Sequence, residues 1–259
     1  MRHIHVHRTG KGRPLLLLHG LGGSWRSWTP VLAWLEQARD VIAIDLPGHG
    51  ASPARPDSGT FAGLADSVDT FIRGSGLTGI DVAGSSLGAR LALELARRGS
   101  VGRTVALNPG GFWKGWERTL FKTTIAASVR LLRATRPVLP MLSRNAAARS
   151  LLLAQLSAHP WRLDGPTVAT ELVDYARTPT FDALVRDLGN GPRQHGPAAP
   201  GSGPVVIGWG RHDRLCLPRQ AARAQAAFPS ARLHWFEHSG HFPAWDEPAE
   251  AARLMLGER

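Results

Sequence analysis

Short apolar runs alternate with longer amphipathic stretches along most of the chain. Almost continuously apolar runs are typical of strands buried on both faces of a parallel sheet, whereas apolar residues spaced three or four apart indicate helices. Strands are predicted at residues 3–7, 14–18, 40–44, 80–83, 103–107, 204–209 and 233–236. Helices are predicted at residues 29–37, 61–72, 87–98, 218–228 and 248–256. This alternation predicts an α/β fold with a mostly parallel central sheet flanked by helices.

The pattern changes between residues 111 and 203, where strand-like runs are absent from the sequence. Four apolar residues form a helical stripe there, at Phe121, Ile125, Val129 and Leu132. A stretch rich in glycine and proline follows at residues 189–201, as expected of a linker. We therefore predict a core made of residues 1–110 and 204–259, and a helical insertion at residues 111–203 that forms a lid.

Positive charge is concentrated in the predicted insertion. The chain has 31 Lys and Arg residues against 20 Asp and Glu. Residues 112–162 hold nine basic residues and one acidic residue, Glu117, and so carry eight of the eleven net positive charges. Basic surfaces can bind anionic membranes or nucleic acid, but the chain contains no recognised nucleic-acid motif. We expect no specific nucleic-acid partner and keep a peripheral contact of the basic lid with anionic surfaces as an alternative.

Membrane spanning, secretion and disulfide bonding are not expected. The longest apolar runs, such as residues 15–18 and 151–154, are far shorter than the ~20 residues that cross a bilayer. The N-terminal residues lack the apolar core of a secretory signal, which predicts a cytoplasmic protein. Cys216 is the single cysteine and cannot form a disulfide within the chain.

A nucleophile elbow is predicted at residues 84–88, which read Gly-Ser-Ser-Leu-Gly. This G-x-S-x-G pattern follows a predicted strand and opens a predicted helix, which is the context that the motif requires. In so sharp a turn the central residue adopts strained backbone angles, and the flanking glycines avoid a steric clash. Ser86 is therefore the candidate nucleophile, at a helix N-terminus that favours developing negative charge.

A serine nucleophile needs a base, and the base needs an acid that orients it. The chain order expected with this motif is Ser, then Asp or Glu, then His. Asp213 and His241 complete that order, each following one of the last two predicted strands. Asp246 and His238 are nearby alternatives, but Asp246 lies only five residues from His241 and His238 does not fit the spacing of its motif. His212, beside Asp213, is interpreted as a loop residue.

Taken together, the motifs resemble those of the α/β-hydrolase family, in particular its lid-bearing, cofactor-independent serine hydrolases. The matching segments are His-Gly-Leu-Gly-Gly at 19–23, Asp-Leu-Pro-Gly-His-Gly-Ala-Ser at 45–52, the elbow, Asp213, and Ser-Gly-His at 239–241. The resemblance implies an α/β-hydrolase fold with a helical lid inserted after the sixth strand, and no metal or organic cofactor. It also implies that the backbone N–H groups of Leu21 and Leu87 form an oxyanion hole, which stabilises the charge of the transition state.

Some members of this family carry the acid after the strand that follows the elbow helix. In this chain that strand is followed by Asn108 and Pro109, which cannot act as an anionic partner. Asp213 therefore stays the predicted acid.

Four apolar residues are candidates for lining an acyl pocket because they adjoin the motifs. They are Trp25, Trp113, Leu215 and Phe242. Three histidines, His3, His5 and His7, share one face of the first predicted strand. No cysteine or carboxylate joins them at ligand spacing, so we predict a solvent-facing edge strand there and no metal site.

The predicted activity is hydrolysis of a carboxylic ester, thioester or lactone through a Ser-His-Asp triad and an acyl-enzyme, on a small-molecule acyl substrate. One alternative is a carbon–carbon bond hydrolase of vinylogous diketones, in which Arg130, Arg133 or Arg136 of the lid would bind a substrate carboxylate. Another is a binding protein that uses the basic lid on an anionic surface. Arg130 and Arg133 lie off the apolar stripe of their helix, so a solvated face is the simpler interpretation of the charge.

Overall fold

The computed structural model describes residues 4–258, which form a seven-stranded sheet in the order β1-β3-β2-β4-β5-β6-β7. The strands are β1 Val6–Thr9, β2 Arg13–Leu18, β3 Arg39–Ile44, β4 Asp81–Ser85, β5 Thr104–Leu107, β6 Val205–Gly210 and β7 Arg232–Phe236. Only β1 pairs antiparallel; the other neighbours are parallel. The predicted α/β architecture is confirmed. The first strand begins three residues later than predicted, and His3 lies outside the described residues.

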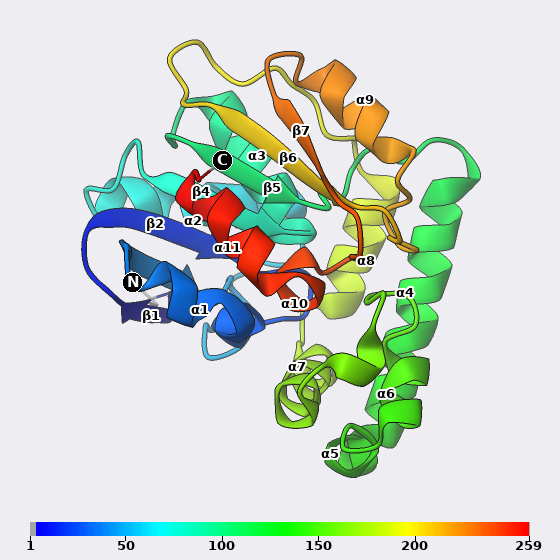
Figure 1. Ribbon diagram of the computed structural model, residues 1–259. Helices are drawn as coiled ribbons and strands as arrows, with labels where there is room; N and C mark the ends of the chain where they lie inside the picture. The colour runs from blue at the N-terminus through cyan, green and yellow to red at the C-terminus, as the bar shows by residue number, and fades with distance from the viewer. Residues whose placement is uncertain (1–3, 259) are drawn as a thin grey trace.

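Helices cover both faces of the sheet (Figure 1). One face is covered by α2 Phe61–Gly74, α3 Leu87–Arg98 and α9 Gln220–Ala227, and the other by α1 Thr29–Leu35, α10 Pro243–Asp246 and α11 Pro248–Leu256. Strand β2 shows why both layers form: Leu16 and Leu18 are buried in the first core, whereas Leu15 and Leu17 are buried in the second. Successive side chains of a strand point to opposite faces, so a run of four leucines needs helices on both sides.

A helical insertion separates β5 from β6 and lies beside the sheet (Figure 1). Its helices are α4 Trp116–Thr135, α5 Leu139–Leu142, α6 Ala146–Leu152, α7 Gly165–Arg177 and α8 Phe181–Asn190, with 3₁₀ turns η2 Arg136–Val138 and η3 Pro160–Arg162. The insertion was expected after the sixth strand, and this is corrected: it follows the fifth described strand. Within residues 4–258 a single strand, β1, precedes β2, so five strands come before the insertion and not the six that were expected.

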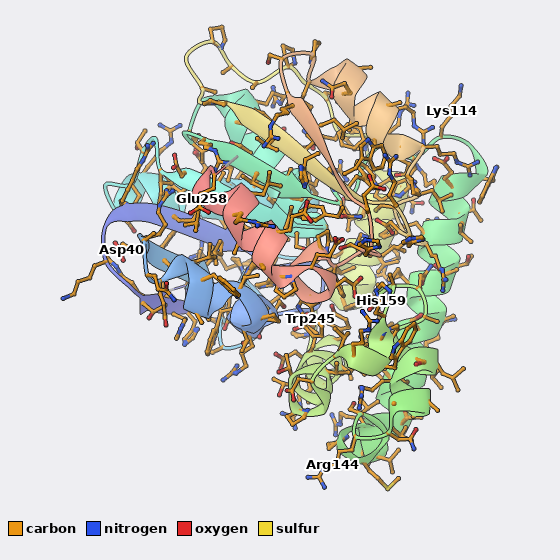
Figure 2. The ribbon with its side chains drawn as sticks, viewed as in Figure 1. Asp40, Lys114, Arg144, His159, Trp245 and Glu258 are labelled. Carbon is orange, nitrogen blue, oxygen red and sulfur yellow. The ribbon has the colours of Figure 1, made fainter. Side chains whose placement is uncertain are left out.

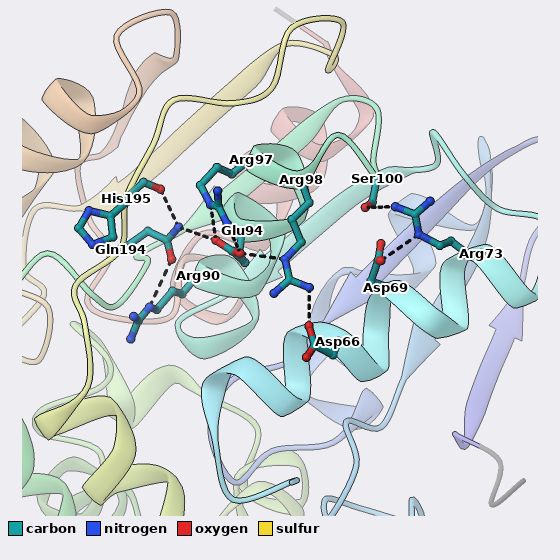
Figure 3. A network of polar contacts seen from close by, with 10 residues as sticks. All are labelled: Asp66, Asp69, Arg73, Arg90, Glu94, Arg97, Arg98, Ser100, Gln194 and His195. Atoms are coloured by element: carbon teal, nitrogen blue, oxygen red, sulfur yellow. Dashed lines mark hydrogen bonds and ion pairs between the residues drawn. The ribbon is translucent and has the colours of Figure 1, made fainter.

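Charged side chains anchor α3, the helix that begins after Ser86 (Figure 3). Burial raises the pKa of Glu94, but hydrogen bonds from Arg97 and Arg98 outweigh it and lower that pKa to about 2. Arg98 also pairs with Asp66 of α2. Arg90, buried one turn into α3, donates to the carbonyl of Pro192 at 2.7 Å and so ties α3 to the end of the insertion.

Within residues 4–258, no helix combines the length and the apolar character that crossing a membrane requires.

Candidate active site

Ser86 occupies a sharp turn between β4 and α3. Its φ of 54° and ψ of −109° are strained for a residue with a side chain. A Cβ atom on Gly84 would lie 2.2 Å from the carbonyl oxygen of Gly88, and one on Gly88 would lie 2.0 Å from the carbonyl oxygen of Leu18. Both glycines are therefore sterically required, as the elbow pattern predicted.

Asp213 and His241 lie in the loops that follow β6 and β7, at the same edge of the sheet. Parallel pairing of these strands brings their carboxyl ends together, and the Nδ1 atom of His241 lies 2.8 Å from Oδ2 of Asp213. Both side chains are buried. Because the carboxylate accepts, Nδ1 carries the proton and Nε2 is the basic nitrogen.

The Nε2 atom of His241 is buried and has no hydrogen-bond partner among residues 4–258. His241 and Ser86 line the same cavity, so the three predicted residues meet at one site. No hydrogen bond joins Ser86 to His241 in the described chain, although both side chains line the same cavity. The unpartnered nitrogen can therefore accept a hydrogen bond from a group bound in that cavity.

The carboxylate of Asp213 accepts hydrogen bonds from three donors besides His241. Its Oδ1 accepts the backbone N–H groups of Leu215 and Cys216 at 2.8 and 2.9 Å. Its Oδ2 accepts from the side-chain amide of Asn108 at 2.5 Å. Four donors stabilise an ionised carboxylate and fix its orientation.

Asn108 was set aside in the sequence because it is not an acid, yet it contacts the predicted acid. It follows β5, the neighbour of β6, and its φ of 48° is a left-handed conformation that asparagine tolerates better than most residues. The signal that could have found it is its position: a polar residue at the carboxyl end of the strand beside the one that carries Asp213.

We expect Asn108→Asp to lower the hydrolytic kcat/KM by about 10- to 100-fold. The substitution keeps the size of the side chain but removes a donor and places a second negative charge against Asp213. Steady-state kinetics at pH 8 measure the loss. Asn145→Asp is the matched control, because Asn145 caps α6 in the insertion and aspartate caps a helix equally well. Full activity in Asn108→Asp would contradict a positioning role for Asn108.

Asp213, Cys216 and His241 also form the one group of potential metal ligands found in the described chain. Both oxygens of Asp213 already accept hydrogen bonds. Burial raises the pKa of the Cys216 thiol, which disfavours the thiolate that binds metal. The donor set is therefore that of a buried hydrogen-bond network and does not suit a metal ion.

The loop at residues 19–23 lies directly against Ser86. A Cβ atom on Gly20 would be 3.4 Å from Cβ of Ser86, and Leu21 lines the same cavity. His19 shapes the loop: its Nδ1 lies 2.7 Å from the carbonyl oxygen of Gly20, and its Nε2 accepts from the N–H of Leu46 at 2.9 Å. Burial lowers the pKa of His19 to about 4, so the ring is neutral at pH 7 and can make both bonds.

Leu87 is the first residue of α3. The N–H groups of the first helical turn have no acceptor within the helix. Its N–H therefore has no acceptor within α3, and Leu87 lines one small cavity together with Ser86 and Leu21.

The cavity at Ser86 has walls from the core and from the insertion. It encloses about 660 Å³, including its open mouth. Two predicted pocket residues, Leu215 and Phe242, line it. Its other lining residues include the helical stripe of α4 and residues of α6 to α8: Phe121, Ile125, Ser128, Val129, Leu132, Leu152, Gln155, Leu156, Leu172, Tyr175 and Phe181. The stripe was visible in the sequence, but its place over Ser86 was not predicted.

The other two predicted pocket residues, Trp25 and Trp113, do not line this cavity. Trp25 stacks on His7 of β1 with ring centroids 3.8 Å apart and is not among the residues that line the cavity, so its prediction is corrected. The cause is η1, Trp25–Trp28, which turns the side chain toward the sheet edge. Trp113 is buried and lines a second, smaller cavity, which Ser86, Leu21 and Leu87 also line.

The alternatives for base and acid are not placed at the site. His238 and His212 are exposed. Asp246 accepts hydrogen bonds from Ser157, Ala158 and Gly240, so it joins the insertion to the loop of His241. It supports that loop without contacting the imidazole in any described hydrogen bond.

Two carboxyl groups of α7, one buried (Glu171) and one half-buried (Asp174), attach the insertion to the loop after β2. Glu171 accepts from the hydroxyl of Ser27 at 2.7 and 2.8 Å, and Asp174 accepts from the hydroxyl of Ser24 at 2.7 Å. Burial raises the pKa of Glu171 to about 7 and raises the pKa of Asp174. The contact between insertion and core therefore depends on the protonation of Glu171 near neutral pH.

We expect the contribution of Glu171 to the free energy of unfolding to decline between about pH 5 and pH 8, by at most about 3 kcal/mol. In this range the unfolded glutamate is ionised while the folded one retains its proton, so rising pH favours unfolding. Denaturant titrations at several pH values should show that Glu171→Gln removes this decline. Buried His19 and His49, whose pKa values burial lowers to about 4 and about 3, act in the opposite sense and cancel in the comparison.

Glu258→Gln, at an exposed position, serves as the control and should leave the pH profile unchanged. Parallel profiles for the wild type and Glu171→Gln would refute the raised pKa.

The sheet order, the elbow and the loop geometry define a class of protein: an α/β-fold hydrolase with a helical insertion over the site. The chain belongs to the alpha/beta hydrolase family, whose model matches residues 15–254.

Two relatives of known name align over nearly the whole chain. The dihydrolipoyllysine-residue acetyltransferase component of the acetoin cleaving system of Cupriavidus necator is 31% identical over 97% of this chain, which spans 64% of the length of that relative. The 2-hydroxy-6-oxononadienedioate/2-hydroxy-6-oxononatrienedioate hydrolase of Klebsiella pneumoniae is 25% identical over 98% of this chain and 89% of its own length.

Among solved structures, a thermophilic esterase from Thermogutta terrifontis superposes with a TM-score of 0.76 over 98% of this chain and 92% of its own. Its sequence identity of 19% makes this a likeness of fold.

Proposed function

We propose that the protein hydrolyses a carboxylic ester through a Ser86 acyl-enzyme. His241 removes the proton of the Ser86 hydroxyl through Nε2, and the hydroxyl oxygen attacks the ester carbonyl. Asp213 orients the imidazole and stabilises its charged form. The imidazolium then protonates the leaving alcohol, and the same histidine activates a water that releases the acid.

The backbone N–H groups of Leu21 and Leu87 are proposed to hold the oxyanion. Donors fixed before the reaction stabilise the tetrahedral intermediate more than the planar ester, and each is worth a few kcal/mol. The neutral His19 supports this role because its two hydrogen bonds fix the conformation of the loop that carries Leu21, next to Ser86.

One observation carries the proposal. His241 is buried, is hydrogen-bonded to Asp213 through Nδ1 and has an unpartnered Nε2. It lines the same cavity as Ser86, whose backbone is strained at the turn between β4 and α3. The apolar lining favours a neutral substrate with an apolar acyl chain. We further propose that residues 111–203 act as a lid, since α4, α6, α7 and α8 supply most of the cavity's outer wall. Thioesters and lactones would undergo the same steps.

The proposal is tested with p-nitrophenyl esters of increasing acyl length and with a fluorophosphonate label. We expect ester turnover and stoichiometric labelling of Ser86, with loss of turnover on labelling. An inactive protein, or a label on another serine, would exclude the mechanism.

Carbon–carbon bond hydrolysis is the second candidate, because the Klebsiella relative named above is a hydrolase of that kind of substrate. Arg130 and Arg136 are exposed, Arg133 pairs with Asp182, and no lysine or arginine of the described chain lines the cavity. A dicarboxylate substrate would thus lack a cationic partner there, which favours the ester. Turnover of a dienoic diketone faster than of any p-nitrophenyl ester would reverse this preference.

A further inference from the structure

The helical insertion exposes a group of large apolar side chains. Those between the middle of α4 and η3 are 41% to 82% exposed; they are Leu131, Val138, Met141, Leu151 and Trp161. The elements that carry them contact one another, η2 with α4 and α5, and η3 with α6. Together they form a lobe that projects from the sheet, with Arg144 at its far end (Figures 1 and 2). Grouped exposed apolar residues mark interaction sites, whereas isolated ones do not.

Basic residues are interspersed with these apolar side chains. Residues 118–163 contain eight basic residues and no acidic residue. Arg149 is buried and donates to backbone carbonyls, and Arg133 pairs with Asp182. Four other arginines are exposed and form no ion pair with a described residue: Arg130, Arg136, Arg144 and Arg162. We call these four and the five apolar residues the lobe surface.

We propose that the lobe surface binds the surface of an anionic lipid bilayer. Arginines attract anionic headgroups, and exposed Leu, Met and Trp side chains enter the boundary between headgroups and acyl chains. Nucleic acid would neutralise the arginines but offers no apolar phase that the exposed apolar side chains could enter. The combination of arginines and apolar side chains on one surface therefore favours lipid. An anionic bilayer repels acidic side chains; none lies within residues 118–163, and the exposed Asp164 follows directly.

The wall of the cavity at Ser86 adjoins the lobe surface. Ser128 of α4 lines the cavity and is also exposed to solvent. Leu131 lies one helical turn further along α4, and the exposed Leu151 is adjacent to Leu152, which also lines the cavity. Bilayer contact would therefore bring this wall of the cavity close to the lipid phase. Delivery of an apolar ester from the bilayer rests on the proposed function; lipid binding itself does not.

The test uses the full chain carrying Ser86→Ala, so that binding is measured without hydrolysis. Co-sedimentation with phosphatidylglycerol vesicles and with phosphatidylcholine vesicles in 0.15 M salt measures the partition coefficient. We compare three sets of substitutions at exposed positions. The charge set is Arg136→Gln, Arg144→Gln and Arg162→Gln; the apolar set is Met141→Ser, Leu151→Ser and Trp161→Ser; the control set, on α1 and α11, is Trp34→Ser and Arg253→Gln.

We expect binding to phosphatidylglycerol vesicles, with a partition coefficient lowered about 10- to 100-fold by the charge set and about 10-fold or more by the apolar set. The control set should bind like the parent. No binding to anionic vesicles, or equal binding by all variants, would overturn the proposal. Duplex DNA binding that the charge set abolishes and the apolar set leaves intact, without vesicle binding, would assign the surface to nucleic acid instead. Unchanged ester turnover when the charge set is placed in the chain that retains Ser86 would separate this result from a failure of the proposed hydrolysis.

Discussion

Ser86→Ala is expected to lower kcat/KM for p-nitrophenyl esters by at least about 10³-fold while leaving the protein folded. Alanine lacks the attacking oxygen, and a water molecule attacking without the acyl-enzyme has no fixed position against the carbonyl. The smaller side chain fits the elbow, because Cβ of Ser86 already has room next to Gly20. Steady-state kinetics give the loss, and circular dichroism with thermal unfolding checks the fold.

Ser85→Ala is the matched control for this prediction. Ser85 is the neighbouring serine and the last residue of β4, outside the strained turn. It should retain activity within a few-fold of the wild type. If Ser86→Ala kept even a tenth of the activity, Ser86 would not be the nucleophile.

Gly88→Ala is expected to lower the free energy of unfolding by about 3 kcal/mol or more, and to abolish activity with it. The added Cβ would lie 2.0 Å from the carbonyl oxygen of Leu18 and 2.6 Å from that of His19. Both contacts are with backbone, which cannot turn aside as a side chain can. Helix α3 must then move away from β2, and this displaces the elbow and the loop that carries Leu21.

Gly74→Ala provides the comparison for stability. Gly74 is the last residue of α2, and a Cβ atom there meets nothing within 4 Å. Alanine is the better helix former, so this variant should match or exceed the wild type by up to about 1 kcal/mol. Urea titrations of both variants test the contrast. Equal stability of Gly88→Ala and wild type would show that the elbow does not need close packing of α3 on β2.

The two predictions separate chemistry from geometry. Ser86→Ala removes one reacting atom from an intact turn, whereas Gly88→Ala keeps the hydroxyl and displaces the turn. Because the first should leave unfolding unchanged and the second should not, measuring both activity and stability in each variant distinguishes a lost nucleophile from a lost scaffold.

The sequence alone determined the layers of the core and the positions of the three predicted site residues. Strands buried on both faces require unbroken apolar runs, such as the four leucines of β2, and an elbow requires glycine at fixed spacing, so both leave local patterns. The order of Ser86, Asp213 and His241 along the chain could be interpreted for the same reason: each follows a recognisable strand.

The tertiary structure decided what depends on contacts between distant segments. The hydrogen bond from Asn108 to Asp213 spans 105 residues, and the one from Ser27 to Glu171 spans 144. The stripe of α4 was recognised as apolar, but which surface it covers is set by packing against α7 and α8, which a local period cannot specify. Trp25 shows the same limit, because only the path of η1 decides whether its ring meets the cavity or His7. The periodicity of the sequence indicates which residues are buried, whereas the packing of helices and strands determines which residues they contact.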